Sequence, residues 1–196
     1  MWVTVEQELG QLLSSKVFPA LRGIPAYDKL ITSSGQPDPA ACKIAAREIV
    51  NSQELKSGIR EFGSREMPKV REWIKPICRA VSVQNNPNGH WWFDEELVRR
   101  WSQKYPQATP NRKQQILESM RPMLAVCFDW NGFTDLRLMR ASGPIPVITG
   151  QGSHQPIFSQ RDPRHANNAN VLFIGGFTQV FVPFVNPAST SLYQIV

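Results

Sequence analysis

Apolar residues recur at helical spacing near the N-terminus and again after residue 38. A helix over residues 3–13 gathers these side chains on one face: Val5, Leu9, Leu12 and Leu13. Asp38-Pro39 then supplies an N-cap acceptor and a preset φ at the first helical position. The apolar face of the helix that follows consists of Cys42, Ala45, Ala46, Ile49 and Val50. The spacing therefore predicts two amphipathic helices joined by a proline-rich connector.

The clearest amphipathic pattern runs over residues 66–81. Its apolar positions are Val70, Trp73, Ile74, Ile77 and Val81. Arg71, Lys75 and Arg79 recur every four residues beside them, which predicts a helix that carries a basic row. Because a proline inside a helix removes a hydrogen bond and clashes with the preceding turn, we expect Pro76 to kink this helix or divide it.

The pattern changes from helical to extended in the last third of the chain. Asp94, Glu95 and Glu96 predict a helix start, since negative charge suits the positive end of the helix dipole. Thr109-Pro110 predicts another start, ahead of apolar residues at helical spacing. After residue 132 the side chains alternate, or are β-branched and aromatic, which predicts strands over residues 133–140, 145–149 and 171–184.

Together these patterns predict an α+β fold in two parts. The N-terminal two thirds are expected to hold about five to six short helices, followed by a β-rich, extended C-terminal third. The division falls at residues 1–132, a helical body, and 133–196, a β-rich segment with an extended C-terminal arm. We expect both to belong to one compact unit, because the length of 196 residues suits one domain with an arm.

Charge stops abruptly before the C-terminal arm. All 22 basic and all 16 acidic side chains lie in the first 164 residues, and residues 165–196 are rich in aromatic and aliphatic side chains. Such a segment must be covered, either within the chain's own sheet or by a neighbouring subunit. Pro183 and Pro187 favour an edge strand or a crossing arm over the middle of a ladder. The arm interpretation predicts these oligomer contacts: Phe177, Phe181, Phe184 and Tyr193.

The net charge of +6 permits binding of a polyanion. The expected nucleic-acid contacts are the basic row and its upstream neighbours: Arg65, Lys69, Arg71, Lys75 and Arg79. Phosphates need positive donors at regular intervals, which such a row supplies. The alternative is an ordinary solvated helix face, since Glu66 and Glu72 dilute the charge. The aromatic cluster over residues 90–93 also has two interpretations, as a surface that stacks on bases or as a core anchor.

A polar loop over residues 150–170 is the one candidate for a small-ligand site. Arg140 and Arg164 flank it and His154 lies within it, and these three residues predict an anion-binding loop. The loop lacks the Lys-Ser/Thr of a phosphate-binding loop and the third glycine of a dinucleotide motif. No arrangement of a nucleophile with a base is visible. We therefore predict no catalytic residue, no metal site and no cofactor.

The remaining features indicate a reduced, cytoplasmic protein, in the host cytoplasm or a virion if the origin is viral. Cys42, Cys78 and Cys127 are far apart, without metal-ligand spacing, and suit small core side chains. No signal peptide is apparent at the N-terminus. The most apolar stretch, residues 171–185, is too short and interrupted to cross a bilayer, so no membrane partner is expected.

Two functions from different classes remain open at this point. The first is a structural or assembly subunit of a larger homo-oligomer, most plausibly a viral or phage virion protein such as a coat, connector or tail component. Its basic face would contact nucleic acid. The second is an intracellular enzyme or nucleic-acid-processing domain with a site near Arg140, His154 and Arg164. The uncharged arm and the missing catalytic pattern favour the first.

Overall fold

The computed structural model describes residues 2–55, 68–81, 89–124, 126, 132–152, 155–156, 172–173 and 175–195. The helices and helical turns of this part include α1 (Trp2–Ser15), η1 (Pro19–Leu21), α2 (Pro25–Asp28), α3 (Pro39–Asn51), α5 (Glu95–Ser102), α6 (Arg112–Leu124) and η3 (Pro187–Ser189). The strands are β1 (Lys69–Trp73), β2 (Ile77–Val81), β3 (Trp91–Asp94), β4 (Asp135–Met139), β5 (Ile145–Gln151), β6 (Gln155–Pro156), β7 (Leu172–Phe173), β8 (Thr178–Phe181) and β9 (Thr190–Leu192).

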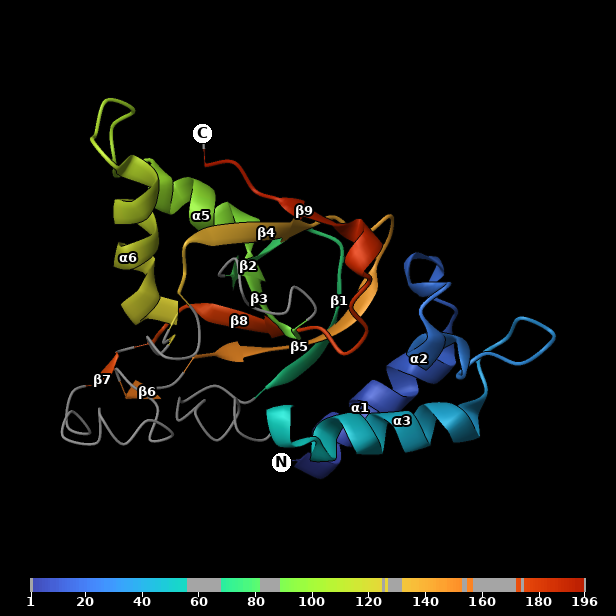
Figure 1. Cartoon of the computed structure of the whole chain (residues 1–196). Helices are drawn as coiled ribbons and strands as arrows, with labels where there is room; N and C mark the ends of the chain where they lie inside the picture. The colour runs from blue at the N-terminus through green and yellow to red at the C-terminus, as the bar shows by residue number, and fades with distance from the viewer. Residues whose placement is uncertain are drawn as a thin grey trace.

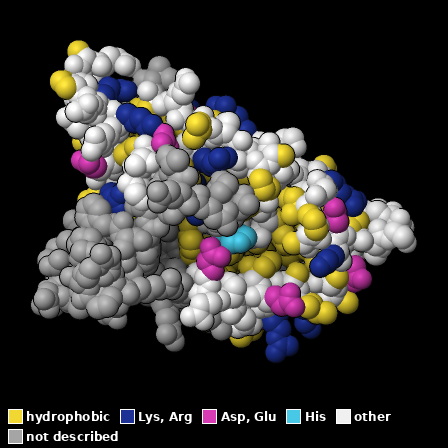
Figure 2. Space-filling model, viewed as in Figure 1, with side chains coloured by type: hydrophobic (Ala, Val, Ile, Leu, Met, Phe, Trp, Pro, Cys, Tyr) yellow, Lys and Arg dark blue, Asp and Glu magenta, His cyan; other side chains and the backbone are white. Residues whose placement is uncertain are grey.

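Two helices at the N-terminus confirm the predicted amphipathic pair. Val5 and Leu9 of α1 and Cys42 of α3 are buried, and the two helices lie side by side (Figure 1). The Asp38 carboxylate caps α3 by accepting hydrogen bonds from the Ala40 and Ala41 backbone amides. Figure 2 shows acidic and basic side chains interspersed over this helical region, which is typical of a solvated surface.

Seven strands form one curved antiparallel sheet in the order β1-β5-β8-β3-β2-β4-β9. Its long-range pairs connect segments far apart in sequence, such as β1 with β5 and β3 with β8. Figure 1 shows the curvature, with β4 and β9 on one side of the fold and β5 and β8 on the other. A separate two-stranded sheet joins β6 and β7.

The predicted division into a helical first two thirds and a β-rich last third is wrong. Three strands, β1, β2 and β3, lie within the first two thirds, and the fold is a mixed α+β arrangement with its sheet spread through the middle and the C-terminal region. Strands from both sides of residue 132 share one sheet. That 1–132 and 133–196 belong to one compact unit stays a prediction.

The error arose in the helix predicted over residues 66–81, because its described part, residues 68–81, contains β1 and β2 instead of a helix. Pro68 precedes β1, and Pro76 lies between the two strands. Proline disfavours helical geometry for the residue before it and cannot donate an interior helical hydrogen bond. The two prolines leave a short segment between Pro68 and Pro76 and another after Pro76. Pairing with β5 stabilises the first as β1, and pairing with β4 stabilises the second as β2.

Two apolar cores hold the helices against the sheet. The first joins α1 and α3 to β1, β5 and β8, and its buried members include Leu9, Ile148 and Phe181. The second joins α5 and α6 to β2 and β4, and includes Leu117 and Leu136. Within the part of the chain that the structure describes, no helix is long and apolar enough to span a bilayer.

The other predicted elements are largely confirmed. Asp94 caps α5 by accepting a hydrogen bond from the Glu96 amide, as the acidic run predicted. The helix predicted after Thr109-Pro110 exists as α6 but begins at Arg112. The strands predicted over 133–140 and 145–149 are β4 and β5. β9, which follows both C-terminal prolines, lies at the edge of the described sheet, as those prolines predicted.

Candidate nucleic-acid interface

The side chains of β1 alternate between the two faces of the sheet. Lys69, Arg71 and Trp73 share one face, because successive residues of a strand point in opposite directions. Val70 and Glu72 share the other face, where Val70 packs against the α1–α3 core. There the Glu72 carboxylate accepts a hydrogen bond from Lys16 Nζ at 2.6 Å. The strand therefore places Lys69 and Arg71 on the face opposite Val70, while Val70 and Trp73 both pack against the α1–α3 core.

The neighbouring strands place small polar side chains beside this basic face. Lys69 lies opposite Thr149 of β5, and Gln151 lies opposite Thr178 of β8. Thr149 is buried, and its hydroxyl donates a hydrogen bond to the Lys69 carbonyl at 3.4 Å. This bond joins β1 to β5 beneath the basic side chains, so their spacing is set by the sheet rather than by a loop.

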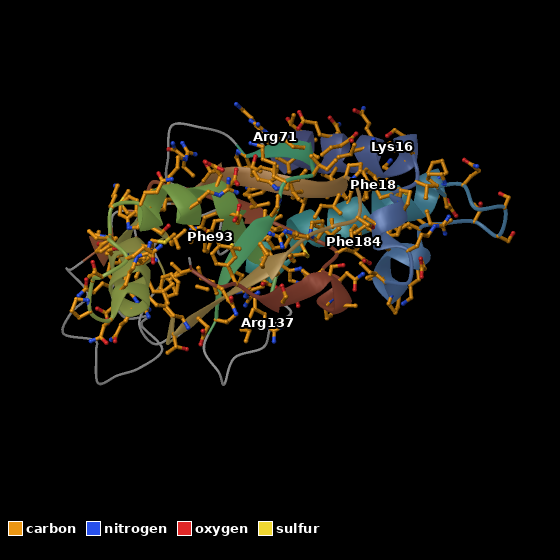
Figure 3. All side chains as sticks on the ribbon, turned by 90° about the horizontal axis from the view of Figure 1, so that it is seen from above. Lys16, Phe18, Arg71, Phe93, Arg137 and Phe184 are labelled. Atoms are coloured by element: carbon orange, nitrogen blue, oxygen red, sulfur yellow. The ribbon has the colours of Figure 1, made fainter. Side chains whose placement is uncertain are left out.

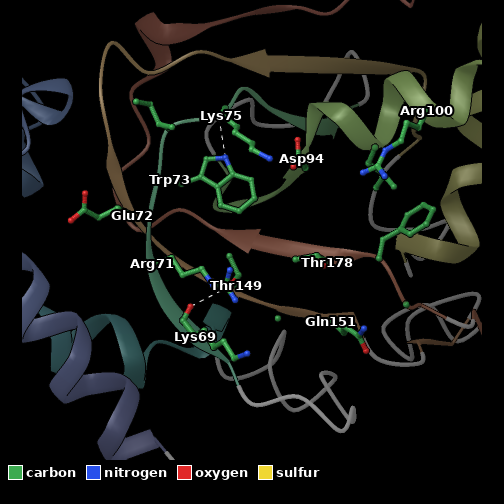
Figure 4. Close-up of a pocket in the computed structure, with 15 residues that line it drawn as sticks. Lys69, Arg71, Glu72, Trp73, Lys75, Asp94, Arg100, Thr149, Gln151 and Thr178 are labelled. Carbon is green, nitrogen blue, oxygen red and sulfur yellow. Dashed lines mark hydrogen bonds between the residues drawn. The ribbon is translucent and has the colours of Figure 1, made fainter.

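A groove of about 600 Å³ opens over these strands and reaches the first turns of α5 (Figure 4). Its charged lining consists of Lys69, Arg71, Glu72, Lys75, Asp94 and Arg100. Its uncharged lining includes Trp73, Leu97, Thr149, Gln151, Phe177 and Thr178. Strands β1, β5 and β8 and helix α5 therefore all contribute to one concave surface.

The free charge of the groove is positive. Glu72 is paired with Lys16, and the Asp94 carboxylate, which caps α5, still carries one negative charge. The cations Lys69, Arg71 and Lys75 outnumber that charge. Among the described residues, no acidic side chain forms an ion pair with Lys69, Arg71 or Lys75. Cationic groups held together without partners repel one another, and an anion that enters the groove removes that repulsion.

A tryptophan stands among these cations. Trp73 lines the groove, and its indole Nε1 donates a hydrogen bond to the Lys75 carbonyl at 2.9 Å. Figure 4 shows the ring between the Lys75 and Arg71 side chains. Trp73 is half-buried and also packs against the α1–α3 core. Because the hydrogen bond and this packing orient the indole, a base that stacks on the exposed part of its ring does so at a small cost in conformational entropy.

The predicted basic row is divided by the structure. Lys69, Arg71 and Lys75 all line the groove. Lys69 and Arg71 lie two residues apart on one face of β1, and Lys75 follows the strand. The prediction of a helical row is therefore wrong. Arg79 lies in β2, away from the residues that line the groove. Arg65 lies outside the described residues.

The predicted oligomer contacts are partly covered by the chain itself. Phe181 is 3% exposed and stacks on His90, and Phe184 is 5% exposed and meets Tyr27 edge-on. Phe177 is half-buried in the groove wall, with its ring 5.2 Å from that of Trp101. The Tyr193 hydroxyl donates a hydrogen bond to Glu95 Oε1 at 3.0 Å. No observation tests whether any of them also contacts a partner, so that stays a prediction.

Of the three residues predicted to bind an anion at the polar loop, the structure describes Arg140 alone. Arg140 is exposed just after β4, and its backbone amide donates to the Ser189 carbonyl. His154 and Arg164 lie outside the described residues. Over the described ranges, no group of three or more His, Cys, Asp or Glu side chains is arranged to hold a metal ion. Cys42 and Cys78 are buried free thiols, and burial raises the pKa of both.

The aromatic cluster over residues 90–93 belongs mainly to the core. Trp92 and Phe93 are buried, as expected of aromatic residues that anchor a helix start. Sequence reasoning missed the groove residues Arg100, Thr149 and Trp73. The alternation Lys69-Val70-Arg71-Glu72-Trp73 is the signal that identifies the basic face, since it has the period of a strand.

No protein-family model matches this chain, and a search of curated proteins found no significant similarity. The chemistry of the groove is therefore argued from its own residues.

Replacing Tyr193 tests the packing of the C-terminal segment against α5. Burial, together with the hydrogen bond to Glu95, raises the pKa of Tyr193 above its ordinary value of 10.0. The folded protein then holds this proton more tightly than the unfolded chain. Its contribution to the free energy of unfolding is complete below pH 10 and declines as the pH rises further. Between about pH 8 and pH 11, Tyr193→Phe should lose less stability in urea unfolding than the wild type.

The stability loss of the variant is compared with that of the wild type, because burial also raises the pKa of Tyr27 and Cys78. Both proteins therefore lose some stability in alkali through these two residues. Identical losses of stability in wild type and variant would show that Tyr193 is not held against Glu95.

Proposed function

We propose that this protein binds single-stranded nucleic acid through the groove over β1, β5 and β8. The observation that carries this proposal is the meeting of Lys69, Arg71 and Lys75, without ion-pair partners among the described residues, around the oriented indole of Trp73. Phosphodiesters need cations spaced along a path, and bases need a flat ring to stack on. The groove offers both on one rigid sheet.

The aromatic component favours a single strand over a duplex. In a duplex the base faces are stacked on one another and cannot reach Trp73, whereas an unpaired base can lie on the indole. Polar side chains such as Thr149, Gln151 and Thr178 then lie within the same groove, where hydroxyl and amide groups can bond to sugar or base atoms. These contacts suit binding with little preference for sequence.

We further propose that the protein acts within a larger homo-oligomeric assembly, such as a viral or phage particle. The support is β9, whose outer edge carries no partner in the described sheet. Leu192 in that strand is 66% exposed. A free edge can pair with the same strand of a second copy. The edge supports this role better than Phe181 and Phe184, which the chain already buries.

The alternative function, an intracellular enzyme or nucleic-acid-processing domain at the loop of Arg140, His154 and Arg164, gains no comparable support. Arg140 is its one described member, and it is exposed just after β4. The groove, in contrast, is formed by described residues from three strands and a helix.

The double variant Lys69→Ala/Arg71→Ala tests the groove. Affinity for a single-stranded oligonucleotide, measured by fluorescence anisotropy at several salt concentrations, should fall at low salt. The slope of log K against log salt should become shallower by about 1.4, since each lost phosphate contact on a single strand removes about 0.7.

A matched control is Lys43→Ala/Arg47→Ala, which removes the same charge from exposed positions on α3. It should leave the slope nearly unchanged. Equal changes in the two variants would indicate attraction by net charge alone and would contradict a groove site.

The assembly proposal is tested by Leu192→Lys, because a charge on an edge strand opposes strand pairing. Light scattering of the full-length protein should give a lower mass for the variant than for the wild type, while Ile44→Lys, an exposed apolar control on α3, should have no effect. A wild type that is monomeric at all concentrations would contradict the proposal.

A further inference from the structure

Phe177 is a second aromatic side chain in the wall of the groove, and β5 separates it from Trp73. Trp73 is paired with Ile145, the first residue of β5. The Phe177 carbonyl accepts a hydrogen bond from the backbone amide of Gly152, directly after the end of this strand. The strand has seven residues, which at roughly 3.3 Å per residue place the two levels about 23 Å apart along the chain. The groove therefore has an aromatic residue toward each end.

The Phe177 ring is held in place from behind. Its backbone amide donates a hydrogen bond to the Met123 carbonyl of α6 at 3.2 Å, after a turn in which Gly176 has a φ of 106°, a value that favours glycine. The ring meets that of Trp101 edge-on, with the ring centres 5.2 Å apart. The Trp101 indole in turn donates a hydrogen bond to Ser119 Oγ at 2.8 Å. Because the ring is ordered before a ligand arrives, stacking on it costs little conformational entropy.

A cation accompanies each end of the groove. Arg71 lies two residues before Trp73, and Figure 3 shows Arg71 on the opposite side of the molecule from Arg137. Arg100 of α5 lines the groove as well, and Figure 4 shows it across the groove from Trp73. Its Nε lies 3.7 Å from Glu96, its one ion pair within the described ranges, and 69% of its side chain is exposed. The Arg100 Nη groups can therefore bond to a phosphate.

We infer that one single strand runs along β5 and stacks one base on Trp73 and a second, non-adjacent base on Phe177. This inference rests on the proposed function and narrows its ligand class to a strand with two unpaired bases several nucleotides apart. A helical strand spaces its nucleotides by about 3.4 Å along its axis, so two adjacent bases do not reach both rings. Once the first base is stacked, stacking of the second is intramolecular and raises the affinity of the whole strand.

The first test uses the wild-type protein, so it does not depend on the folding of a variant. Isothermal titration calorimetry gives the Kd of single-stranded oligonucleotides of about eight nucleotides, a usual site size, in which all residues but one or two are abasic. All carry the same number of phosphates and hence share the same electrostatic attraction. At some separation, two bases should bind at least about fivefold more tightly than one base or two adjacent bases.

The second test assigns this preference to Phe177. Phe177→Leu keeps an apolar side chain against Trp101 but removes the flat ring, so a separated pair of bases should bind no more tightly than one base. Phe177→Tyr keeps the ring and should retain the preference. A matched control, Tyr105→Leu, removes a partly buried ring from the same core outside the groove lining and should also retain it. The thermal unfolding midpoint verifies that each variant is folded.

The outcomes separate this inference from the proposed function. A preference for separated bases that disappears in Phe177→Leu and persists in Tyr105→Leu supports the inference. If binding depends on Lys69 and Arg71 but the Kd is the same for one base, adjacent bases and separated bases, the inference is overturned and the proposed function stands. A preference that survives in folded Phe177→Leu also overturns it. A wild type that binds none of these oligonucleotides, nor one with all its bases, overturns both.

Discussion

The pairing of β1 with β5 is the constraint on which the rest of the molecule depends. Pro68 and Pro76 confine residues 69–73 to a short extended segment, and that segment becomes a stable strand only when β5 supplies its hydrogen bonds. Once the register is set, the two-residue repeat of the strand assigns every side chain to a face. Val70 enters the core beside α1, while Lys69 and Arg71 point into the groove. One long-range pairing thus links the core to the basic surface.

Local signals in the sequence were sufficient for much of the secondary structure. Asp38 and Asp94 predicted helix starts correctly, because an N-cap acts through hydrogen bonds within its own first turn. Residues 66–81 could not be assigned in this way. Their apolar positions fit a helical period, and of the residues in β1 only the basic pair Lys69 and Arg71 has the two-residue spacing of a strand. Pairing with a distant strand decides the outcome, and the partner of Lys69 in β5 is Thr149, 80 residues further along the chain.

The candidate site shows the same limit. The sequence identified Lys69, Arg71 and Lys75 as a basic group, and the structure does bring these residues together. It could not show that Thr149 and Arg100 join them, or that Arg79 separates from them, since those facts depend on strand order. The uncharged C-terminal segment is a related case. Its apolar pattern requires that the segment be buried but does not show whether this chain or a partner covers it. Phe181 is covered by this chain.

The most direct test of the central claim is photochemical cross-linking of a short single-stranded oligonucleotide that carries a photoreactive base, followed by mass spectrometry of the linked peptides. A base that stacks on Trp73 lies within bonding distance of β1 and its neighbours. The account predicts cross-links in residues 69–75, with weaker ones in β5 or at the start of β8. Cross-links confined to α1, α2 and α3, where opposite charges are interspersed, would contradict it.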